Sequence, residues 1–199
     1  MPKPVLYFAR HGQTDWNAQR RLQGQLDIPL NDLGRSQSNQ CAGILRDLLI
    51  RDGCHIAGLD YVASPLGRAR ETMELIRIGL GLEPTAYRTD PRLMEMSFGR
   101  WEGHTFEELK LREAESLAAR DLDRLGYVVP GGESYRQLAA RVRAWYDGIE
   151  HDTVVAAHGG VCRALMSELG AMANDTGSTG EIGQGVIYVF SEAGLTRYE

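Results

Sequence analysis

Two apolar runs that lie far apart in the chain each end in a histidine followed by a glycine. Residues 5–12 read VLYFARHG and residues 153–160 read TVVAAHGG. An apolar run of about five residues that stops at a polar turn predicts a fully buried strand. Because open α/β sheets bind their ligands just past the carboxyl ends of the strands, we expect His11 and His158 to face one another at that edge.

Segments typical of strands alternate along the chain with segments typical of helices. Strands are expected at 5–9, 59–63, 153–157 and 186–190, with an extended stretch at 85–94. Helices are expected at about 31–51, 64–79, 105–125, 134–149 and 161–169, and a Gly/Thr/Ser-rich loop at 174–185. Ser64 and Pro65 predict a helix that starts with a serine N-cap and a proline at its first position. The alternation predicts an α/β fold, a three-layer α/β/α sandwich with a mostly parallel central sheet.

The length of 199 residues suits a single domain with a sizeable core. We expect residues 1–199 to form that domain, with residues from about 96 to 133 as a helical cap segment over the site. No apolar stretch approaches the ~20 residues that a membrane span needs, and the first residues do not resemble a signal peptide. Three widely spaced cysteines suit reduced thiols, so we expect a cytoplasmic protein.

The net charge of −5 argues against nucleic acid or an anionic membrane as partner. An anionic substrate then needs a local cluster of cations. Arg10 and Arg68 follow two of the expected strands, and guanidinium groups bind phosphate oxygens bidentately. Asn17 adds an amide donor, unless it only caps a turn, and the backbone N–H of Gly159 adds another. These residues predict a phosphate site.

Two histidines in one cationic pocket predict a division of labour. We expect His11 to attack phosphorus as the neutral nucleophile, and His158 to stay protonated and stabilise charge on the phosphoryl oxygens. The expelled alcohol needs a proton, and Glu95 is the candidate donor, because its Met/Phe/Trp-rich surroundings favour a raised pKa. Glu102 is the competing acid, and Glu95 alternatively serves only in an ion pair. The sequence does not decide which nitrogen of His11 attacks.

Four segments resemble the signature blocks of the histidine phosphatase (phosphoglycerate mutase-like) superfamily. They are residues 10–17 (RHGQTDWN), 64–72 (SPLGRARET), 95–103 (EMSFGRWEG) and 158–160 (HGG). The resemblance implies a phosphohistidine intermediate on His11 and a phosphate pocket that includes Arg10, Asn17, Arg68 and His158. It also implies Glu95 as proton donor, with no metal and no other cofactor.

Within that superfamily, residues 22–30 (LQGQLDIPL) resemble the small bacterial phosphatases, and Gln23 and Gly24 are therefore assigned to substrate binding. The mutases tend to have a Phe-x-Gly-Trp run there and an added lid that shields the phosphohistidine from water. We therefore expect a phosphatase acting on a small phosphorylated metabolite, with a bisphosphoglycerate-dependent phosphoglycerate mutase as the alternative. A non-catalytic phosphoryl-binding module is the alternative from another class. The resemblance also allows a homodimer without deciding the oligomeric state.

Overall fold

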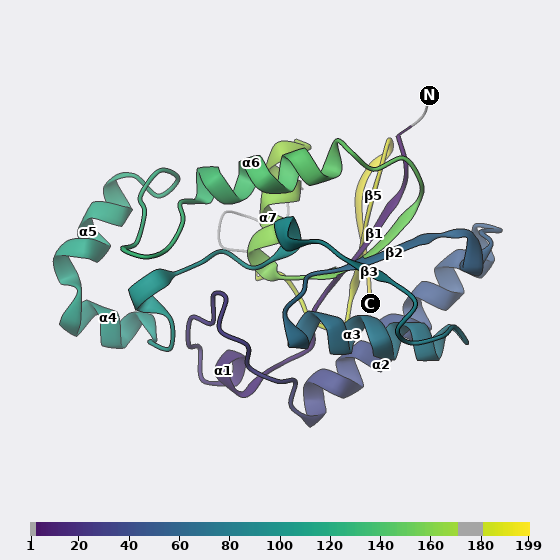
Figure 1. Ribbon diagram of the computed structural model, residues 1–199, viewed down its shortest axis with the longest axis horizontal. Helices are drawn as coiled ribbons and strands as arrows, with labels where there is room; N and C mark the ends of the chain where they lie inside the picture. Colours follow the sequence, from purple (N-terminus) through teal and green to yellow (C-terminus); the bar gives the residue numbers. More distant parts are fainter. Residues whose placement is uncertain (1–2, 171–180) are drawn as a thin grey trace.

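A six-stranded sheet forms the middle layer of the protein (Figure 1), with the strand order β3-β2-β4-β1-β5-β6. The computed structural model describes residues 3–170 and 181–199. The strands are β1 (Leu6–Arg10), β2 (Asp60–Ala63), β3 (Arg88–Thr89), β4 (Thr153–Ala157), β5 (Ile187–Ser191) and β6 (Gly194–Tyr198). β1 to β4 run parallel to one another, and β5 pairs antiparallel with both β1 and β6. The mostly parallel sheet predicted from the sequence is therefore confirmed.

The register of the two central strands sets up the site. In the β1–β4 pair, Leu6 lies opposite Thr153 and Arg10 lies opposite Ala157, so both strands end at the same edge. The backbone N–H of His11 donates to the carbonyl of Ala157 at 2.9 Å, which extends the pairing by one residue. The two His-Gly turns therefore leave the sheet side by side.

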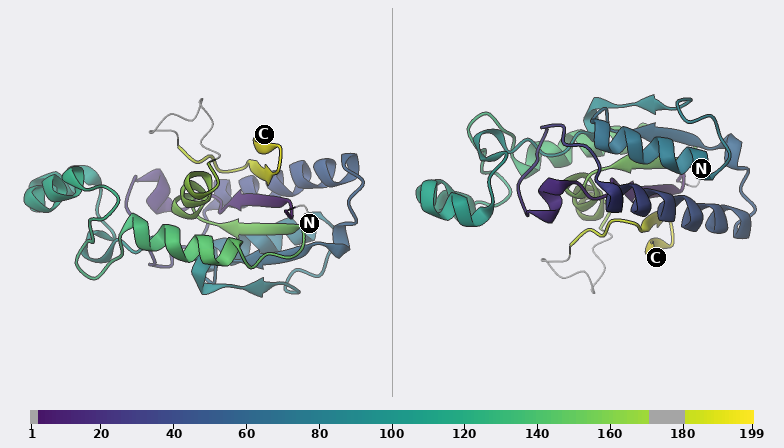
Figure 2. Two further views of the ribbon diagram at one scale, coloured as in Figure 1. Left: turned by 90° about the horizontal axis from the view of Figure 1, so that it is seen from above. Right: turned by 90° about the horizontal axis from the view of Figure 1, so that it is seen from below.

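Helices cover both faces of the sheet, as the two views of Figure 2 show. α2 (Asp32–Arg51) and α3 (Gly67–Gly79) pack on one face, and α6 (Tyr135–Tyr146) and α7 (Gly159–Glu168) pack on the other. Strand side chains alternate between the layers: Tyr7 and Ala9 of β1 join the core with α2 and α3, while Leu6 and Phe8 join the core with α6 and α7. The expected three-layer sandwich is thus confirmed. None of the helices in the described ranges is long and apolar enough to cross a membrane.

The start of α3 differs from the prediction. The helix begins at Gly67, with Leu66 at the N-cap position and no side-chain cap, so Ser64 and Pro65 precede it. The hydroxyl of Ser64 is instead 2.8 Å from Nε2 of His158. Asp27 takes over part of the capping expected of Ser64, because its Oδ2 accepts from the backbone N–H of Gly67 at 2.9 Å.

Other helix starts are as predicted. The side chain of Asn31 caps α2, and Ser134 forms a capping box with Gln137 at the start of α6. The stretch expected to be extended at 85–94 contains only the short β3 and then a 3-10 turn over Pro91–Leu93. Of the loop expected at 174–185, residues 181–185 are irregular, and the remainder lies outside the described residues. β6 was not predicted.

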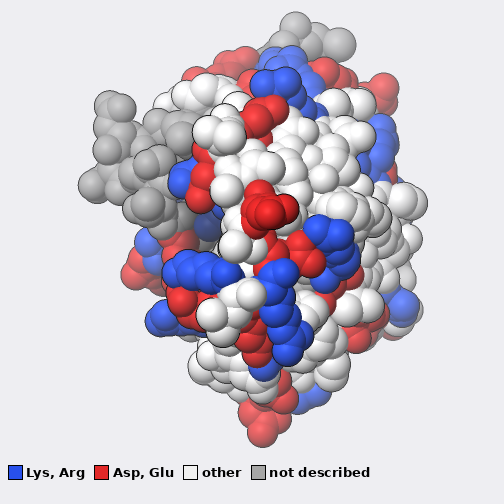
Figure 3. All heavy atoms as spheres, turned by 90° about the vertical axis from the view of Figure 1, so that its left-hand side faces the viewer, with Lys and Arg blue, Asp and Glu red and all other residues white. Residues whose placement is uncertain are grey.

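The segment between β3 and α6 projects from the sandwich, on the left in Figure 1. It includes α4 (Phe106–Arg112) and α5 (Ala114–Leu122), so the charged helical region expected at 105–125 is two helices. Glu113 separates them with φ −134° and ψ 32°. A small apolar cluster of Trp101, Leu109 and Val129 holds this segment together. Figure 3 views this end, where basic and acidic side chains are intermixed.

Two further helical elements precede β2. α1 (Asp15–Ala18) is a single turn that follows the first His-Gly turn, and a 3-10 turn covers Ile56–Gly58. A third 3-10 turn, Gly99–Trp101, opens the projecting segment. Its first residue has φ 49°, and a Cβ there would lie 2.3 Å from the carbonyl oxygen of Pro130, so glycine permits this close approach.

Candidate active site

His11 and His158 meet at the carboxyl ends of β1 and β4. Their ring centroids are 5.1 Å apart and the ring planes are tilted by 60°. Both residues are buried, with exposed fractions of 2% and 0%. The two imidazoles are therefore close enough to contact one tetrahedral anion between them, as expected from the two His-Gly turns at the ends of their strands.

The ring of His11 is held in one orientation by its neighbour. Nδ1 lies 2.7 Å from the carbonyl oxygen of Gly12, and because a carbonyl only accepts, Nδ1 carries the hydrogen in the neutral ring. Nε2 then keeps its lone pair, and no hydrogen bond to another described residue occupies it. Gly12 is itself tightly packed, because a Cβ there would lie 2.0 Å from the carbonyl oxygen of Gly34. Nε2 is thus the ring nitrogen able to act as a nucleophile.

The ring of His158 contacts Ser64 at the carboxyl end of β2. Its Nε2 lies 2.8 Å from the hydroxyl of Ser64, just after β2, while its Nδ1 is buried without a hydrogen-bond partner. An unsatisfied buried polar atom costs about 1–3 kcal/mol, so Nδ1 of His158 is an atom that a bound ligand would satisfy. The sequence alone did not identify Ser64 as its partner.

The guanidinium groups of Arg10 and Arg68 both donate hydrogen bonds to backbone carbonyls of the protein. Arg68 is fully buried, and its Nη1 and Nη2 donate to the carbonyls of Leu26 and Gly24, each at 2.7 Å. Nη1 of Arg10 donates to the carbonyl of Ile182. The Nε atoms of Arg10 and Arg68 are both buried without a partner. Each Nη atom of Arg68 keeps a second hydrogen, so Nε and the remaining Nη hydrogens are the donors left for an anion.

Burial and then nearby positive charges lower the pKa of the two rings. Burial lowers the pKa of His11 well below its ordinary value, and the charges of Arg68 and Arg10 lower it further. The pKa of His158 is also lowered well below its ordinary value, by burial first and then by Arg68 and its neighbours. Both imidazoles are therefore neutral near pH 7 without an anion. The neutral form is the one expected of His11, whereas the lowered pKa of His158 disfavours the protonated form expected of it.

Glu95 lies where the proton donor is expected. Its carboxylate accepts from the backbone N–H of Met96 at 2.9 Å and of Gly160 at 3.1 Å, so it sits against the first turn of α7. Burial lowers the pKa of both Arg10 and Arg68, and Glu95 is the strongest charge that opposes this lowering. The carboxylate is therefore close to both guanidinium groups.

The competing acid, Glu102, has a different position. Its Oε1 accepts from the backbone N–H groups of Gln25 at 3.1 Å and Phe98 at 3.0 Å, which ties two loops together. This contact requires glycine at position 24, because a Cβ there would lie 1.9 Å from Oε1 of Glu102. Oε1 of Glu102 therefore has a structural role, because it links these two loops.

The residues predicted to bind substrate differ in their contacts. Gln23 is 7% exposed and its Oε1 has no partner, whereas Gly24 contributes its carbonyl to Arg68. Gly159 is the first residue of α7, and a Cβ there would lie 3.5 Å from Nε of Arg10. Gly24 therefore acts on the site through its backbone and through Arg68.

The side chain of Asn17 forms a capping box with Thr14 at the start of α1, and it also contacts Gln184 near the other end of the chain. Its Oδ1 accepts from the backbone N–H of Thr14 at 3.1 Å and from Nε2 of Gln184 at 3.2 Å. Gln184 donates as well to the carbonyl of His11 at 3.0 Å. Because these donors all meet Oδ1, the Nδ2 donor of Asn17 is left for a ligand. Gln184 was missed by the sequence analysis because it fell in an expected loop, with no pattern linking it to residues 11–17.

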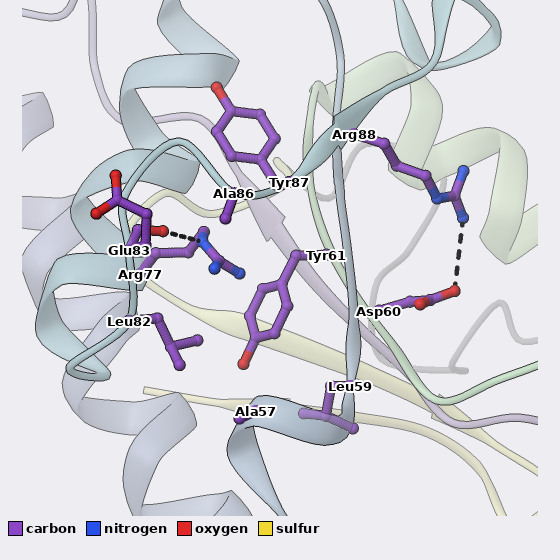
Figure 4. A pocket seen from close by; sticks show the side chains of 10 residues that line it. All are labelled: Ala57, Leu59, Asp60, Tyr61, Arg77, Leu82, Glu83, Ala86, Tyr87 and Arg88. Atoms are coloured by element: carbon purple, nitrogen blue, oxygen red, sulfur yellow. Dashed lines mark hydrogen bonds and ion pairs between the residues drawn. The ribbon is translucent and has the colours of Figure 1, made fainter.

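A cavity of about 580 Å³ lies at the other end of β2 (Figure 4), near Asp60 and Tyr61. Its polar groups satisfy one another: Nε of Arg77 donates to the carbonyl of Glu83 at 2.7 Å, and the guanidinium lies 4.5 Å from the Tyr61 ring centre. Burial raises the pKa of Tyr61 to about 12, so its phenol is a weak nucleophile. The groups that suit phosphoryl chemistry are therefore at the carboxyl edge.

The described residues contain no group of three or more His, Cys, Asp or Glu side chains placed to hold a metal ion. Among the buried side-chain atoms left without partners are three nitrogens of the candidate site: Nε of Arg10, Nε of Arg68 and Nδ1 of His158. Such a set suits an anion with several oxygens, beside a neutral imidazole able to attack it.

Comparison with known sequences is consistent with this geometry. Residues 6–194 match the sequence model of the histidine phosphatase superfamily (branch 1). A curated relative from Yersinia pestis (strain Pestoides F), named "Probable phosphoglycerate mutase GpmB", is 35% identical over 142 residues. That alignment covers 71% of this chain and 61% of the relative, so the chain spans about three fifths of the length of this curated protein.

Solved structures show the same fold. A phosphoglycerate mutase from Thermus thermophilus is 31% identical, with a TM-score of 0.72 and coverage of 98% of both chains. A protein named "Mycobacterial hydrolase 1" is 30% identical, with a TM-score of 0.75 and coverage of 94% of this chain and 89% of its own. Similar chains therefore include one named as a mutase and one named as a hydrolase.

Proposed function

Because this chain belongs to the histidine phosphatase superfamily (branch 1), we propose that it is a phosphatase acting on a small phosphorylated metabolite. The reaction passes through a phosphohistidine on His11, needs no metal, and takes place in the cytoplasm. The observation that carries the proposal is the buried ring of His11: its Nδ1 is bonded to Gly12, its centroid is 5.1 Å from that of His158, and the Nε atoms of Arg10 and Arg68 are buried without partners.

In the first half-reaction, Nε2 of His11 attacks phosphorus and forms a P–N bond, while the P–O bond to the substrate alcohol breaks. Glu95 in its protonated form gives its proton to the departing oxygen and becomes a carboxylate. Arg10, Arg68 and His158 donate to the phosphoryl oxygens, and Asn17 and the N–H of Gly159 add neutral donors. This division of work is supported by the buried nitrogens of Arg10, Arg68 and His158 that have no hydrogen-bond partner.

In the second half-reaction, water replaces the alcohol. The carboxylate of Glu95 takes a proton from that water as its oxygen attacks phosphorus, and the P–N bond to His11 breaks. Inorganic phosphate leaves, and both His11 and protonated Glu95 are restored. The same carboxyl therefore acts first as acid and then as base, as microscopic reversibility requires.

A phosphoglycerate mutase is the second candidate, because relatives of this chain carry that name. In a mutase, the phosphohistidine must survive while the bisphosphorylated intermediate turns over, so water must be kept out. The loop at 22–30 resembles the phosphatases, and the segment at about 96–133, which we propose forms the cap, is short. Both features favour hydrolysis.

Two assays test the proposal. Incubation with 4-nitrophenyl phosphate in the presence of EDTA should release phosphate, and His11→Ala should abolish the release. Incubation with 3-phosphoglycerate and a trace of 2,3-bisphosphoglycerate separates the candidates, because 2-phosphoglycerate without free phosphate would identify a mutase. An interaction module would show neither activity and would acquire no acid-labile phosphoryl label on His11.

A further inference from the structure

One ion pair near the site is better shielded from water than the others. Arg141 of α6 binds Glu133 through two parallel contacts, Nη2 to Oε1 at 2.6 Å and Nε to Oε2 at 3.1 Å. The two side chains are 21% and 16% exposed, whereas every other ion pair between described residues has one side chain at least 37% exposed. Exposed pairs contribute little, but a shielded bidentate pair fixes geometry.

The remaining donors and acceptors of this pair all reach the segment that contains Glu95. Nη1 of Arg141 donates to the carbonyl of Arg92 at 2.6 Å, and Nη2 donates to the carbonyl of Glu95 at 3.1 Å. Oε1 of Glu133 accepts from the N–H of Ser97 at 3.0 Å. The ion pair therefore contacts the backbone before Glu95, at Glu95 and after it.

This segment has few other constraints. Residues 94–97 lie between two 3-10 turns and make no strand pairing. Their backbone–backbone hydrogen bonds lie at the two ends, at the N–H of Met94 and the carbonyl of Ser97, and the bonds between are made by side chains. The carbonyl of Glu95 accepts a second bond from Nε2 of Gln25 at 3.2 Å. On its other side, the Glu95 carboxylate meets the N–H of Gly160. The backbone position set by Arg141 thus determines whether the carboxyl reaches α7 and the phosphate pocket.

We propose that the Glu133–Arg141 ion pair is a positioning unit that aligns Glu95 with the leaving-group oxygen. This inference rests on the proposed function, because it assigns the pair to the proton-transfer step of that reaction. The charge of Arg141 also contributes to the lowered pKa of His158, which places the guanidinium near the pocket.

A positioning role makes a prediction that a purely structural role does not. Proton donation matters most when the leaving group is a strong base, and matters little when it is a weak base. 4-Nitrophenyl phosphate and phenyl phosphate have similar shapes, but the phenolate of the second is the much stronger base. A misplaced Glu95 should therefore slow phenyl phosphate selectively. The parameter to compare is kcat/KM, because it reports phosphoryl transfer and excludes the later hydrolysis step.

We expect Arg141→Gln to lower kcat/KM for phenyl phosphate by about 10- to 100-fold more than for 4-nitrophenyl phosphate. Glu95→Gln should show the same selectivity, and adding Arg141→Gln to it should cause little further selective loss. Arg143→Gln is the matched control, because Arg143 lies on the same helix but pairs with Asp147. It should leave both substrates at the wild-type rate.

Equal losses on both substrates in Arg141→Gln would overturn the positioning role and leave the phosphatase intact. If that variant does not fold, Glu133→Gln keeps an acceptor for Ser97 while removing the charge from the pair. It should show a smaller selective loss in the same direction, and equal losses there would again overturn the inference. A wild-type protein inactive on both esters would instead contradict the proposed function.

Discussion

Nδ1 of His11 lies 2.7 Å from the carbonyl oxygen of Gly12, and this contact leaves the lone pair of the neutral ring on Nε2. We expect the phosphoryl group to be found on Nε2 after brief reaction with substrate and quenching in alkali. Two-dimensional NMR of the denatured phosphoenzyme distinguishes the two isomers of phosphohistidine. A label on Nδ1 would show that the ring turns before reacting and would contradict the orientation set by Gly12.

The buried neutral histidines should make stability depend on pH. In the unfolded chain both rings bind a proton near pH 6.5, whereas in the folded protein their pKa values are held well below that. Below pH 6.5 the unfolded state therefore binds more protons, and the free energy of unfolding falls as the pH falls, by up to about 1.4 kcal/mol per pH unit for each ring. Stability is fully present above pH 6.5.

Urea denaturation at pH 7.5 and pH 5.5 measures this dependence. His158→Gln should lose less stability between the two pH values than the wild type, because one buried ring is gone. His151→Gln is the control, since His151 is exposed, and its loss should equal that of the wild type. Identical losses in all three proteins would mean that His158 is protonated in the folded state.

Inorganic phosphate should bind at the unpaired nitrogens and raise Tm. Nε of Arg10 and Nδ1 of His158 lack partners in the described structure, and an anion would satisfy both. At a phosphate concentration 100 times Kd, the gain is about 2.7 kcal/mol, which thermal denaturation readily detects. Arg10→Gln should lose most of this shift. Arg70→Gln should retain it, because Arg70 lies on the surface of α3 near Glu74; a shift that both variants keep would place the anion elsewhere.

Much of the fold follows from local sequence pattern. The two central strands are unbroken apolar runs, and such runs are buried on both faces in a parallel sheet. The helix starts at Asn31 and Ser134 were predictable because the capping side chain bonds to a backbone N–H three residues away. β6 was not predicted because it is an edge strand with mostly exposed residues, which leaves no apolar alternation to detect.

The parts of the site that sequence reasoning missed depend on long-range contacts. Ser64 has the pattern of an N-cap, but its hydroxyl is engaged by a histidine 94 residues away. Arg68 was expected to bind phosphate, but the sequence did not show that one hydrogen of each Nη atom is donated to a loop carbonyl. The protonation of His158 was predicted from its role, whereas burial and neighbouring cations decide it. In each case, the residues that bond to the side chain or lower its pKa lie far from it in the sequence.

Gln184 should matter for substrate binding through Asn17. Replacing it with leucine removes the donor to Oδ1 of Asn17 and to the carbonyl of His11, so the Asn17 amide keeps only its bonds to Thr14. We expect Gln184→Leu to lower kcat/KM for 4-nitrophenyl phosphate by about 10-fold, as loss of one neutral hydrogen bond allows. Gln19→Leu, on the exposed end of α1, should have no effect. An unchanged Gln184→Leu enzyme would show that Asn17 is oriented by Thr14 alone.

Gly160→Ala should lower the activity while it leaves the stability almost unchanged. A Cβ at this position would lie 2.3 Å from Oε1 of Glu95, and since that atom is the end of a flexible side chain, the carboxylate can move away at little cost. Alanine also favours the helix by up to about 1 kcal/mol. We therefore expect Tm to stay within a few degrees of the wild type, while kcat/KM for phenyl phosphate falls by about 100-fold because the proton donor is displaced. Gly43→Ala in α2, where a Cβ would meet nothing within 4 Å, should raise Tm slightly and leave activity unchanged. Full activity in Gly160→Ala would mean that the Glu95 carboxylate does not need its contact with α7 to act.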